Sequence, residues 1–168
     1  KSTLSHALID AVPDTVIAVS HTTRKPRPGE ENGIDYFFVS QPDFLNLINS
    51  GDMLEYAEVY DNLYGTSRES IDQPFSEGKN IILDIDWQGA RRIKAIYPDA
   101  ISVQILPPGE KESEKRLISR QQDSKQTIMA RMATYKEQMS HQDEYDYIII
   151  NDDLAEATRQ LISILPLS

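Results

Sequence analysis

The first three residues, Lys1-Ser2-Thr3, have the order found at the end of a phosphate-binding loop. In the full pattern, G-x-x-x-x-G-K-[ST], the lysine reaches the outer phosphates of a nucleotide and the hydroxyl that follows it ligates Mg²⁺. The glycines of this pattern would precede Lys1, so we expect the protein to extend in that direction. A lysine followed by two hydroxyl residues is also common at an ordinary helix start, and the remainder of the chain must decide between the two.

A second group of residues suits an anion. Arg24 and Arg27 stand in a loop stiffened by two prolines, each of which biases the residue before it toward extended conformations. Two guanidinium groups on a short rigid loop suit a phosphate or a carboxylate. The hydroxyls of Tyr36 and Tyr64 could donate to the same anion. Solvated surface arginines and half-buried strand tyrosines explain these four residues equally well when they are taken alone.

Three carboxylates stand next to apolar sequence. Glu55 has apolar neighbours on both sides, so it must find donors or raise its pKa. The N1–H and 2-amino groups of guanine match one carboxylate, although an arginine partner or an outward-facing position would serve as well. Asp84 and Asp86 alternate at the end of an apolar run, so we expect them on opposite faces. One could face a nucleotide and its Mg²⁺, or both could be turn residues.

Three arginines could act on a transferring phosphoryl group. Arg116 and Arg120 are spaced i, i+4 and share one helix face, and Arg131 belongs to the next helical segment. Arginines on a movable segment suit a clamp that neutralises charge during phosphoryl transfer. A salt-bridged helix face is the simpler local explanation. The sequence has no Ser-His-Asp, Cys-His or close carboxylate-pair pattern, which fits a reaction based on positioning and electrostatics.

The helices and strands that must position these residues can be expected from apolar patterns in the sequence, and these patterns predict an α/β fold. Near-continuous apolar runs at 16–19, 81–85, 101–106 and 147–150 indicate strands of a parallel sheet covered on both faces. Helical apolar stripes lie at 4–11 and 154–165. Polar residues follow each strand, at the edge where open parallel sheets bind ligands.

Two stretches interrupt this alternation of predicted strands and helices. Residues 21–78 read as an inserted α+β lobe, in which Ser40 is the expected N-cap of a helix that Gly51 ends. Residues 108–130 are rich in charge and read as a helical excursion that could be a mobile lid. The remaining core covers about residues 1–20, 79–107 and 131–168 of a single domain.

Composition narrows the classes of function. The chain has 168 residues, enough for one domain with a sizeable core, and a net charge of −10 at pH 7. That charge argues against a general nucleic-acid or anionic-membrane surface, but it leaves room for a small anion in a locally basic pocket. The absence of cysteine excludes disulfides and thiolate chemistry, and the three histidines lack metal-ligand spacing. No apolar run approaches a membrane span, and the expected location is the cytoplasm.

Six segments in collinear order resemble the guanylate kinase family, whose members phosphorylate GMP with ATP. Each segment alone is modest evidence, but their order and spacing are specific, and together they cover essentially the whole chain. The form D-I-D-W-Q-G-A is closer to bacterial members of the family. The six segments are residues 19–30, 33–39, 55–58, 62–67, 83–90 and 150–153.

The resemblance implies a role for each candidate residue. It implies that the GMP phosphate is held by Ser20, Arg24, Arg27, Tyr36 and Tyr64. It implies that the guanine is read by Glu55, Thr66 and Asp86. It implies that ATP and Mg²⁺ are served by Lys1, Ser2, Thr3, Asp84 and Asn151, with Ser2 and Asp84 as the metal ligands. It implies that catalysis of the transfer falls to Lys1, Arg116, Arg120 and Arg131.

The family fold is a P-loop kinase-type parallel sheet flanked by helices, with an inserted α+β GMP-binding lobe and a helical lid. Lobe closure around both substrates would keep water from accepting the phosphoryl group. The implied partners are the small molecules GMP and ATP, with no nucleic acid and no membrane, and the oligomeric state stays open. Gln121 stands where the family usually has glycine, so we expect a different lid turn.

Two alternatives remain at this stage. Guanylate-kinase-like domains of membrane scaffolds bind phosphopeptides and have lost catalysis, usually with a degraded phosphate loop or lost lid arginines. The lid arginines persist here, which argues against that class. A kinase for another monophosphate, such as UMP or AMP, is opposed by Glu55 and Thr66.

Overall fold

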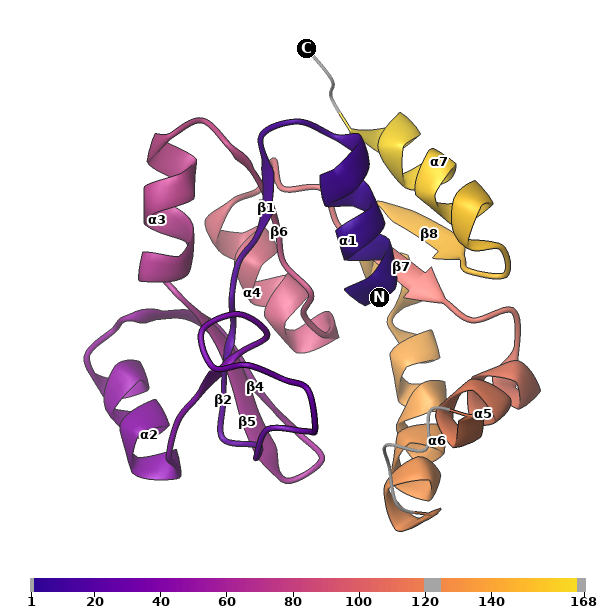
Figure 1. The fold of residues 1–168 in the computed structure, drawn as a ribbon, viewed down its shortest axis with the longest axis horizontal. Coiled ribbons are helices and arrows are strands. Elements are labelled where there is room, and N and C mark those ends of the chain that lie inside the picture. The colour runs from indigo at the N-terminus through magenta and orange to yellow at the C-terminus, as the bar shows by residue number, and fades with distance from the viewer. Residues whose placement is uncertain (1, 120–124, 166–168) are drawn as a thin grey trace. The chain divides into compact units, whose positions relative to one another are not determined.

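The computed structural model describes residues 2–119 and 125–165 (Figure 1). The chain divides into two compact units. The central unit is Pro13–Ala100, and the terminal unit combines Lys1–Val12 with Ile101–Ser168. Among the described residues no helix is both long and apolar enough to cross a membrane.

The central unit contains two sheets. Strands β1 (Thr15–Ile17) and β6 (Asn80–Ile82) pair in parallel, with Val16 opposite Ile81. The second sheet has the order β3-β2-β5-β4, in which β2 and β3 are parallel and the other neighbours antiparallel. Its strands are β2 (His21–Thr22), β3 (Phe37–Phe38), β4 (Met53–Val59) and β5 (Asn62–Ser67).

Three helices complete the central unit: α2 (Gln41–Asn49), α3 (Glu69–Ser76) and α4 (Trp87–Ile96). The predicted N-cap of α2 is confirmed, because the Ser40 hydroxyl accepts a hydrogen bond from the backbone N–H of Asp43 at 3.2 Å. Gly51 adopts a φ of +79° just beyond this helix, a conformation that suits glycine at a helix end. Both ends of α2 therefore follow from local sequence.

The core of the central unit lies between the parallel pair and helices α3 and α4. Its buried side chains are Ala18, Leu54, Ile71 and Ile93, and the partly buried Ile81, Leu83, Ile85, Tyr97 and Ala100 pack against them. Leu54 connects this core to β4 of the second sheet. Glu55, the next residue of β4, is consequently held by a packed strand rather than by a loop.

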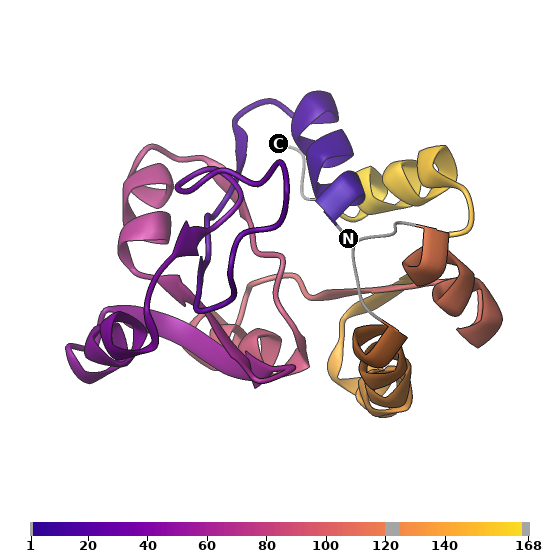
Figure 2. The same ribbon diagram turned by 60° about the horizontal axis from the view of Figure 1, so that its bottom comes forward.

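The terminal unit contains the other parallel pair, β7 (Val103–Leu106) and β8 (Tyr147–Ile150). Its helices are α1 (Ser2–Ala11), α5 (Glu110–Ser119), α6 (Lys125–Ser140) and α7 (Leu154–Ile164), with a short 3-10 helix at Gln142–Glu144. Helix α1 lies beside α7 in both views of the ribbon (Figures 1 and 2). Leu4, Ile149 and Ala157 form the buried centre of this packing, which confirms the two predicted helical stripes.

The α/β class with parallel strands is confirmed, and each predicted apolar run overlaps a strand. The prediction that both faces are covered is wrong for β8. Ile149 is 2% exposed, whereas Ile148 and Ile150 on the opposite face are 45% and 59% exposed. Successive side chains of a strand point to opposite faces, and in β8 the face of Ile149 is the one that packs against α1 and α7.

Candidate active site

One deeply buried candidate is a carboxylate on β4. Glu55 is 3% exposed and stands opposite Thr66 of β5 in the antiparallel register. The Thr66 hydroxyl donates to Glu55 Oε1 at 2.6 Å. The turn between the two strands has positive φ at both of its residues, Tyr60 and Asp61, as favoured two-residue hairpin turns require. This turn sets the register that brings the carboxylate and the hydroxyl together.

Burial raises the pKa of Glu55 to about 6. The hydrogen bond from Thr66 opposes this shift, the charge of Asp86 adds to it, and the charge of Arg92 opposes it. A buried carboxylate lowers the stability of the folded protein when it is ionised. Glu55 accepts one hydrogen bond from Thr66 and can accept more from a ligand. Near neutral pH it is mostly ionised and can accept from two donors at once.

Ser20 joins this pair. Its hydroxyl lies 3.4 Å from the Thr66 hydroxyl. Thr66 has a single hydroxyl hydrogen, which it gives to Glu55, so Ser20 is the donor in this contact. The structure thus brings Ser20 to the residues predicted to read a base. Its predicted contact with a phosphate stays a prediction.

Arg24 is held by Glu30 within the same loop. Its Nη1 donates to Glu30 Oε2 at 2.9 Å and to the carbonyl of Lys25 at 2.8 Å, and its Nη2 donates to Glu30 Oε1 at 2.8 Å. A guanidinium has five N–H groups; these contacts use three, and Arg24 also makes a side-chain hydrogen bond with Tyr64. The pair with Glu30 therefore orients Arg24 next to Tyr64.

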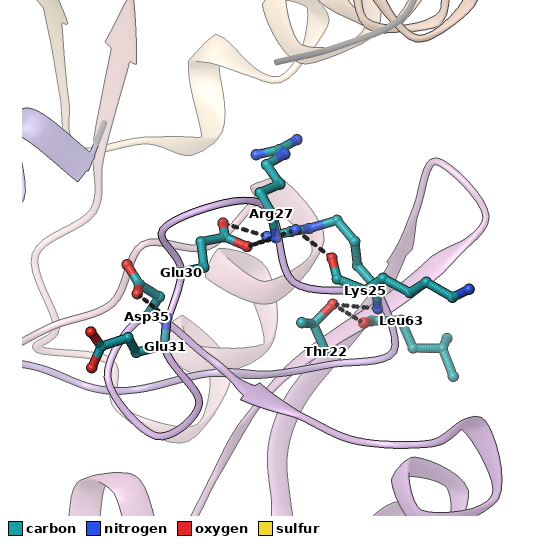
Figure 3. A network of polar contacts seen from close by, with 8 residues as sticks. Thr22, Lys25, Arg27, Glu30, Glu31, Asp35 and Leu63 are labelled. Carbon is teal, nitrogen blue, oxygen red and sulfur yellow. Dashed lines mark hydrogen bonds and ion pairs between the residues drawn. The ribbon is translucent and has the colours of Figure 1, made fainter.

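The same pairing shifts the pKa of both partners. Burial alone would lower the pKa of Arg24 and raise that of Glu30. Their mutual hydrogen bonds and charges outweigh burial, so the pKa of Arg24 is raised and that of Glu30 is lowered. The backbone N–H of Arg27 also donates to Glu30, at 2.6 Å. The side chain of Arg27 extends away from Glu30 (Figure 3).

Two tyrosines lie at the same place as Arg24. The guanidinium carbon of Arg24 is 5.4 Å from the ring centroid of Tyr36, and the rings of Tyr36 and Tyr64 are 6.0 Å apart. Burial raises the pKa of Tyr36, and the charge of Asp84 adds to this. The phenol consequently stays protonated and able to donate. The structure brings together three of the residues predicted to hold a phosphate.

Asp84 and Asp86 follow β6 rather than belonging to it, because the strand ends at Ile82. The prediction that the two side chains lie on opposite faces of a strand is wrong, because both residues lie beyond β6 and because residues two apart in a strand share one face. Asp86 is the N-cap of α4: its Oδ1 accepts from the backbone N–H of Gly89 at 3.0 Å, and its Oδ2 accepts from the Gln88 side chain at 3.1 Å. Among the described residues no three carboxylate or imidazole side chains gather as a metal site.

The candidates for ATP belong to the terminal unit. Ser2 and Thr3 open α1, and the backbone N–H of Asn151 donates to the carbonyl of Leu106 at 2.7 Å, beyond the end of β8. Arg116 lies on α5 and Arg131 on α6, as the helical periodicity predicted. Lys1 and Arg120 lie outside the described residues.

Glu30 is a site residue that the sequence reasoning missed, although a signal was present. Pro28-Gly29 is a typical turn dipeptide, and Gly29 adopts a φ of +89°. The turn brings the backbone N–H of Glu30 to the carbonyl of Arg27 at 3.1 Å, and the Glu30 carboxylate back to Arg24. An acidic residue just after a turn in an arginine loop indicates such a pair.

We expect Glu30→Ala to raise KM for a phosphate-bearing substrate roughly 3- to 10-fold with kcat changed less than about twofold, because Arg24 then loses its orientation before the phosphate arrives. Initial-rate kinetics at saturating co-substrate measure both constants. Glu31→Ala is the matched control, since Glu31 is exposed and makes no ion pair with Arg24. A fall in KM would show instead that Glu30 competes with the phosphate.

Almost the whole chain is similar to known proteins. A model of the guanylate kinase family matches residues 1–167. Guanylate kinase from Shewanella violacea is 50% identical over 166 residues, which are 98% of this chain and 80% of that protein. Guanylate kinase from Escherichia coli K12 is 49% identical, over 98% of this chain and 81% of that protein. The crystal structure of guanylate kinase from Anaplasma phagocytophilum superposes with a TM-score of 0.82 at 34% identity and covers 97% of this chain and 79% of that one.

Proposed function

The chain belongs to the guanylate kinase family, and on that premise we propose how its residues divide the work of phosphorylating GMP with ATP. The enzyme transfers the γ-phosphoryl group of ATP to the phosphate of GMP, which gives ADP and GDP. Such a transfer needs positioning and electrostatic stabilisation more than covalent chemistry by the protein. The residues of the central unit are assigned to GMP and those of the terminal unit mainly to ATP.

The observation that carries the GMP assignment is the buried Glu55 carboxylate with Thr66 beside it. Its ionised form can accept from the N1–H and the 2-amino group of guanine. Adenine has an acceptor at N1, so it would leave this buried carboxylate without a donor pair, a strong basis for discrimination. Asp86 adds a second carboxylate next to the base.

The phosphate of GMP is assigned to Arg24, Arg27, Tyr36 and Tyr64. The N–H groups that Arg24 does not use for Glu30 and Lys25, together with protonated phenol groups near its guanidinium, support this assignment. Charge-assisted hydrogen bonds from a guanidinium fork are among the strongest available for a phosphate. Ser20 completes the predicted set, and its contact with Thr66 supports a place nearer the base.

For ATP we assign Lys1, Ser2, Thr3 and Asn151, with Ser2 and Asp84 as ligands of Mg²⁺. Hydroxyl and carboxylate oxygens are the donors that Mg²⁺ prefers, and it usually takes one or two protein ligands beside phosphates and water. The lack of a three-residue metal cluster among the described residues is compatible with that mode. Mg²⁺ held by Ser2 and Asp84 would neutralise charge on the phosphates.

The lid residues Arg116, Arg120 and Arg131 are assigned to the transferring phosphoryl group, where guanidinium groups stabilise developing charge. We also propose a cytoplasmic location, where both nucleotides occur. The division into a core, a GMP-binding lobe at 21–78 and a lid at 108–130 stays part of this proposal.

A coupled ADP-release assay on the protein with its complete phosphate loop tests the proposal. ATP, Mg²⁺ and each nucleoside monophosphate in turn are supplied, and we expect turnover with GMP and dGMP but not with AMP or UMP. Removal of Mg²⁺ by a chelator should stop turnover and leave GMP binding in place. Absence of turnover with every monophosphate, despite GMP binding, would identify a binding module instead.

The pKa of Glu55 predicts how GMP recognition depends on pH. Guanine needs the ionised carboxylate, and burial raises its pKa to about 6, so the ionised fraction falls as the pH drops through that value. We expect KM for GMP to rise about tenfold between pH 7 and pH 5 from this cause. GMP itself takes up a proton near pH 6, so the Glu55→Gln variant serves as reference. An identical pH profile in that variant would contradict the prediction.

A further inference from the structure

Gly89 leaves the space that the Glu55 carboxylate occupies. Gly89 is buried in the first turn of α4. A Cβ atom built on this residue would stand 2.4 Å from Glu55 Oε2 and 3.1 Å from its carboxyl carbon. The first of these distances is far below van der Waals contact. A side chain at position 89 and the observed position of the Glu55 carboxylate therefore exclude each other.

We propose that Gly89 is a specificity-determining residue, which by lacking a side chain lets Glu55 present its carboxylate to guanine. The inference rests on the proposed role of Glu55 as the reader of the guanine base. Gly89 would belong to the residues that determine guanine recognition without touching the substrate. Gly89 acts through Glu55 and is a positioning residue in that sense.

Two hydrogen bonds keep the carboxylate and the glycine close together. Thr66 holds Glu55 Oε1 at 2.6 Å, while the other oxygen, Oε2, lies against Gly89. The backbone N–H of Gly89 donates to Asp86 Oδ1 at 3.0 Å, which fixes the first turn of α4. The carboxylate thus lies between Thr66 of β5 and the start of α4.

The nature of the close contacts distinguishes this glycine from one required by the fold. The nearest atoms to the added Cβ belong to the end of a flexible side chain, and the next contact, Ile85 Cβ at 3.2 Å, can yield by a few tenths of an ångström. By contrast, a Cβ at Gly65 would stand 2.8 Å from the backbone carbonyl of Glu55. We therefore expect a substitution at position 89 to displace Glu55 and to leave the backbone in place.

The test is Gly89→Ala, assayed with GMP and with inosine monophosphate, which lacks the 2-amino group. We expect kcat/KM for GMP to fall by about 10²-fold and the preference for GMP over inosine monophosphate to fall toward one. KM for ATP should stay within about twofold. The thermal midpoint should not fall, because alanine favours a helix more than glycine does.

Gly109→Ala adds the same methyl group where no atom lies within 4 Å. Because Gly109 lies in the proposed lid, this control is read by the preference for GMP over inosine monophosphate, which should stay that of the wild type. In a Glu55→Ala background the carboxylate is gone, so adding Gly89→Ala should change kcat/KM for GMP less than threefold. This double-mutant cycle assigns the effect to the contact between the two residues.

Four outcomes would overturn the inference. Gly89→Ala could keep the wild-type preference for GMP, or lose activity with both monophosphates equally, which is the result of general loosening. Both Gly89→Ala and its Glu55→Ala double variant could fail to fold, which would make the glycine a requirement of the backbone. If the wild type and Gly109→Ala do not phosphorylate GMP at all, it is the proposed function that fails, and the inference with it.

Discussion

Replacing Glu55 by glutamine is expected to lower kcat/KM for GMP by about 10³-fold. The carboxylate offers charged acceptors to two guanine donors, and a hydrogen bond to a charged group contributes about 1.5–3 kcal/mol. Glutamine has nearly the same shape but no charge, and its amide N–H₂ would oppose one of the donors. Initial-rate kinetics with GMP, dGMP and AMP measure the loss. The ratio of kcat/KM for GMP to kcat/KM for AMP should fall as well.

The same substitution should make the free protein more stable. Burial raises the pKa of Glu55 from an ordinary 4.5 to about 6, so the folded protein binds a proton more readily than the unfolded chain between these values. Stability is therefore lost as the pH rises through that window, and above it the buried charge costs about 2 kcal/mol. Glutamine removes this cost at pH 7 and changes little at pH 4, which urea unfolding at both pH values measures.

Glu58→Gln is the matched control for both measurements, because Glu58 is exposed on the same strand. It should leave kinetics and stability close to those of the wild type. A Glu55→Gln enzyme that keeps kcat/KM for GMP within tenfold would remove Glu55 from base recognition. A loss of stability at pH 7 would show that the carboxylate is better compensated in the fold than its burial indicates.

The hairpin that carries Glu55 shows how far local sequence could lead. The sequence predicts an α+β lobe at 21–78, and the structure has β4 at Met53–Val59 within it. The contact between Glu55 and Thr66 depends on pairing register, which the two-residue turn at Tyr60 and Asp61 sets. That turn has no Asn-Gly or Asp-Gly signal, so the sequence could not predict the register. The family resemblance, rather than any local pattern, placed both residues in one site.

Asp86 and Gly89 show which parts of the site the sequence could not predict. The segment with Asp84 and Asp86 reads as the continuation of an apolar strand, but residues two apart in a strand share one face, so strand periodicity does not give the opposite orientation expected for them. The strand ends earlier, and Asp86 becomes a helix N-cap, a role that aspartate also favours. Periodicity cannot show that Gly89, in the turn that this cap begins, lies against a carboxylate from a strand more than 30 residues earlier. Such contacts come from packing alone.

Replacing Arg24 is the second change with a large expected effect. Arg24→Ala should lower kcat/KM for GMP by about 10³-fold, because the phosphate loses a charged fork and the partly buried Glu30 carboxylate loses its partner. Arg24→Lys keeps the charge but has no planar fork to serve Glu30 and a phosphate together, so we expect a loss of about 10²-fold. Initial rates with GMP as varied substrate, at saturating ATP, measure both variants.

The unpaired Glu30 could lower stability and so complicate the reading of Arg24→Ala. The double variant Arg24→Ala with Glu30→Gln removes that charge, and it should recover stability in urea unfolding without recovering activity. Lys25→Ala is the control for a loss of positive charge from the same loop, since the Lys25 side chain is exposed and only its carbonyl contacts Arg24. If Lys25→Ala lowers kcat/KM for GMP as much as Arg24→Lys does, the loop acts through its net charge. A preserved rate in Lys25→Ala would instead mean that the orientation imposed by Glu30 lets Arg24 bind the phosphate through a defined fork.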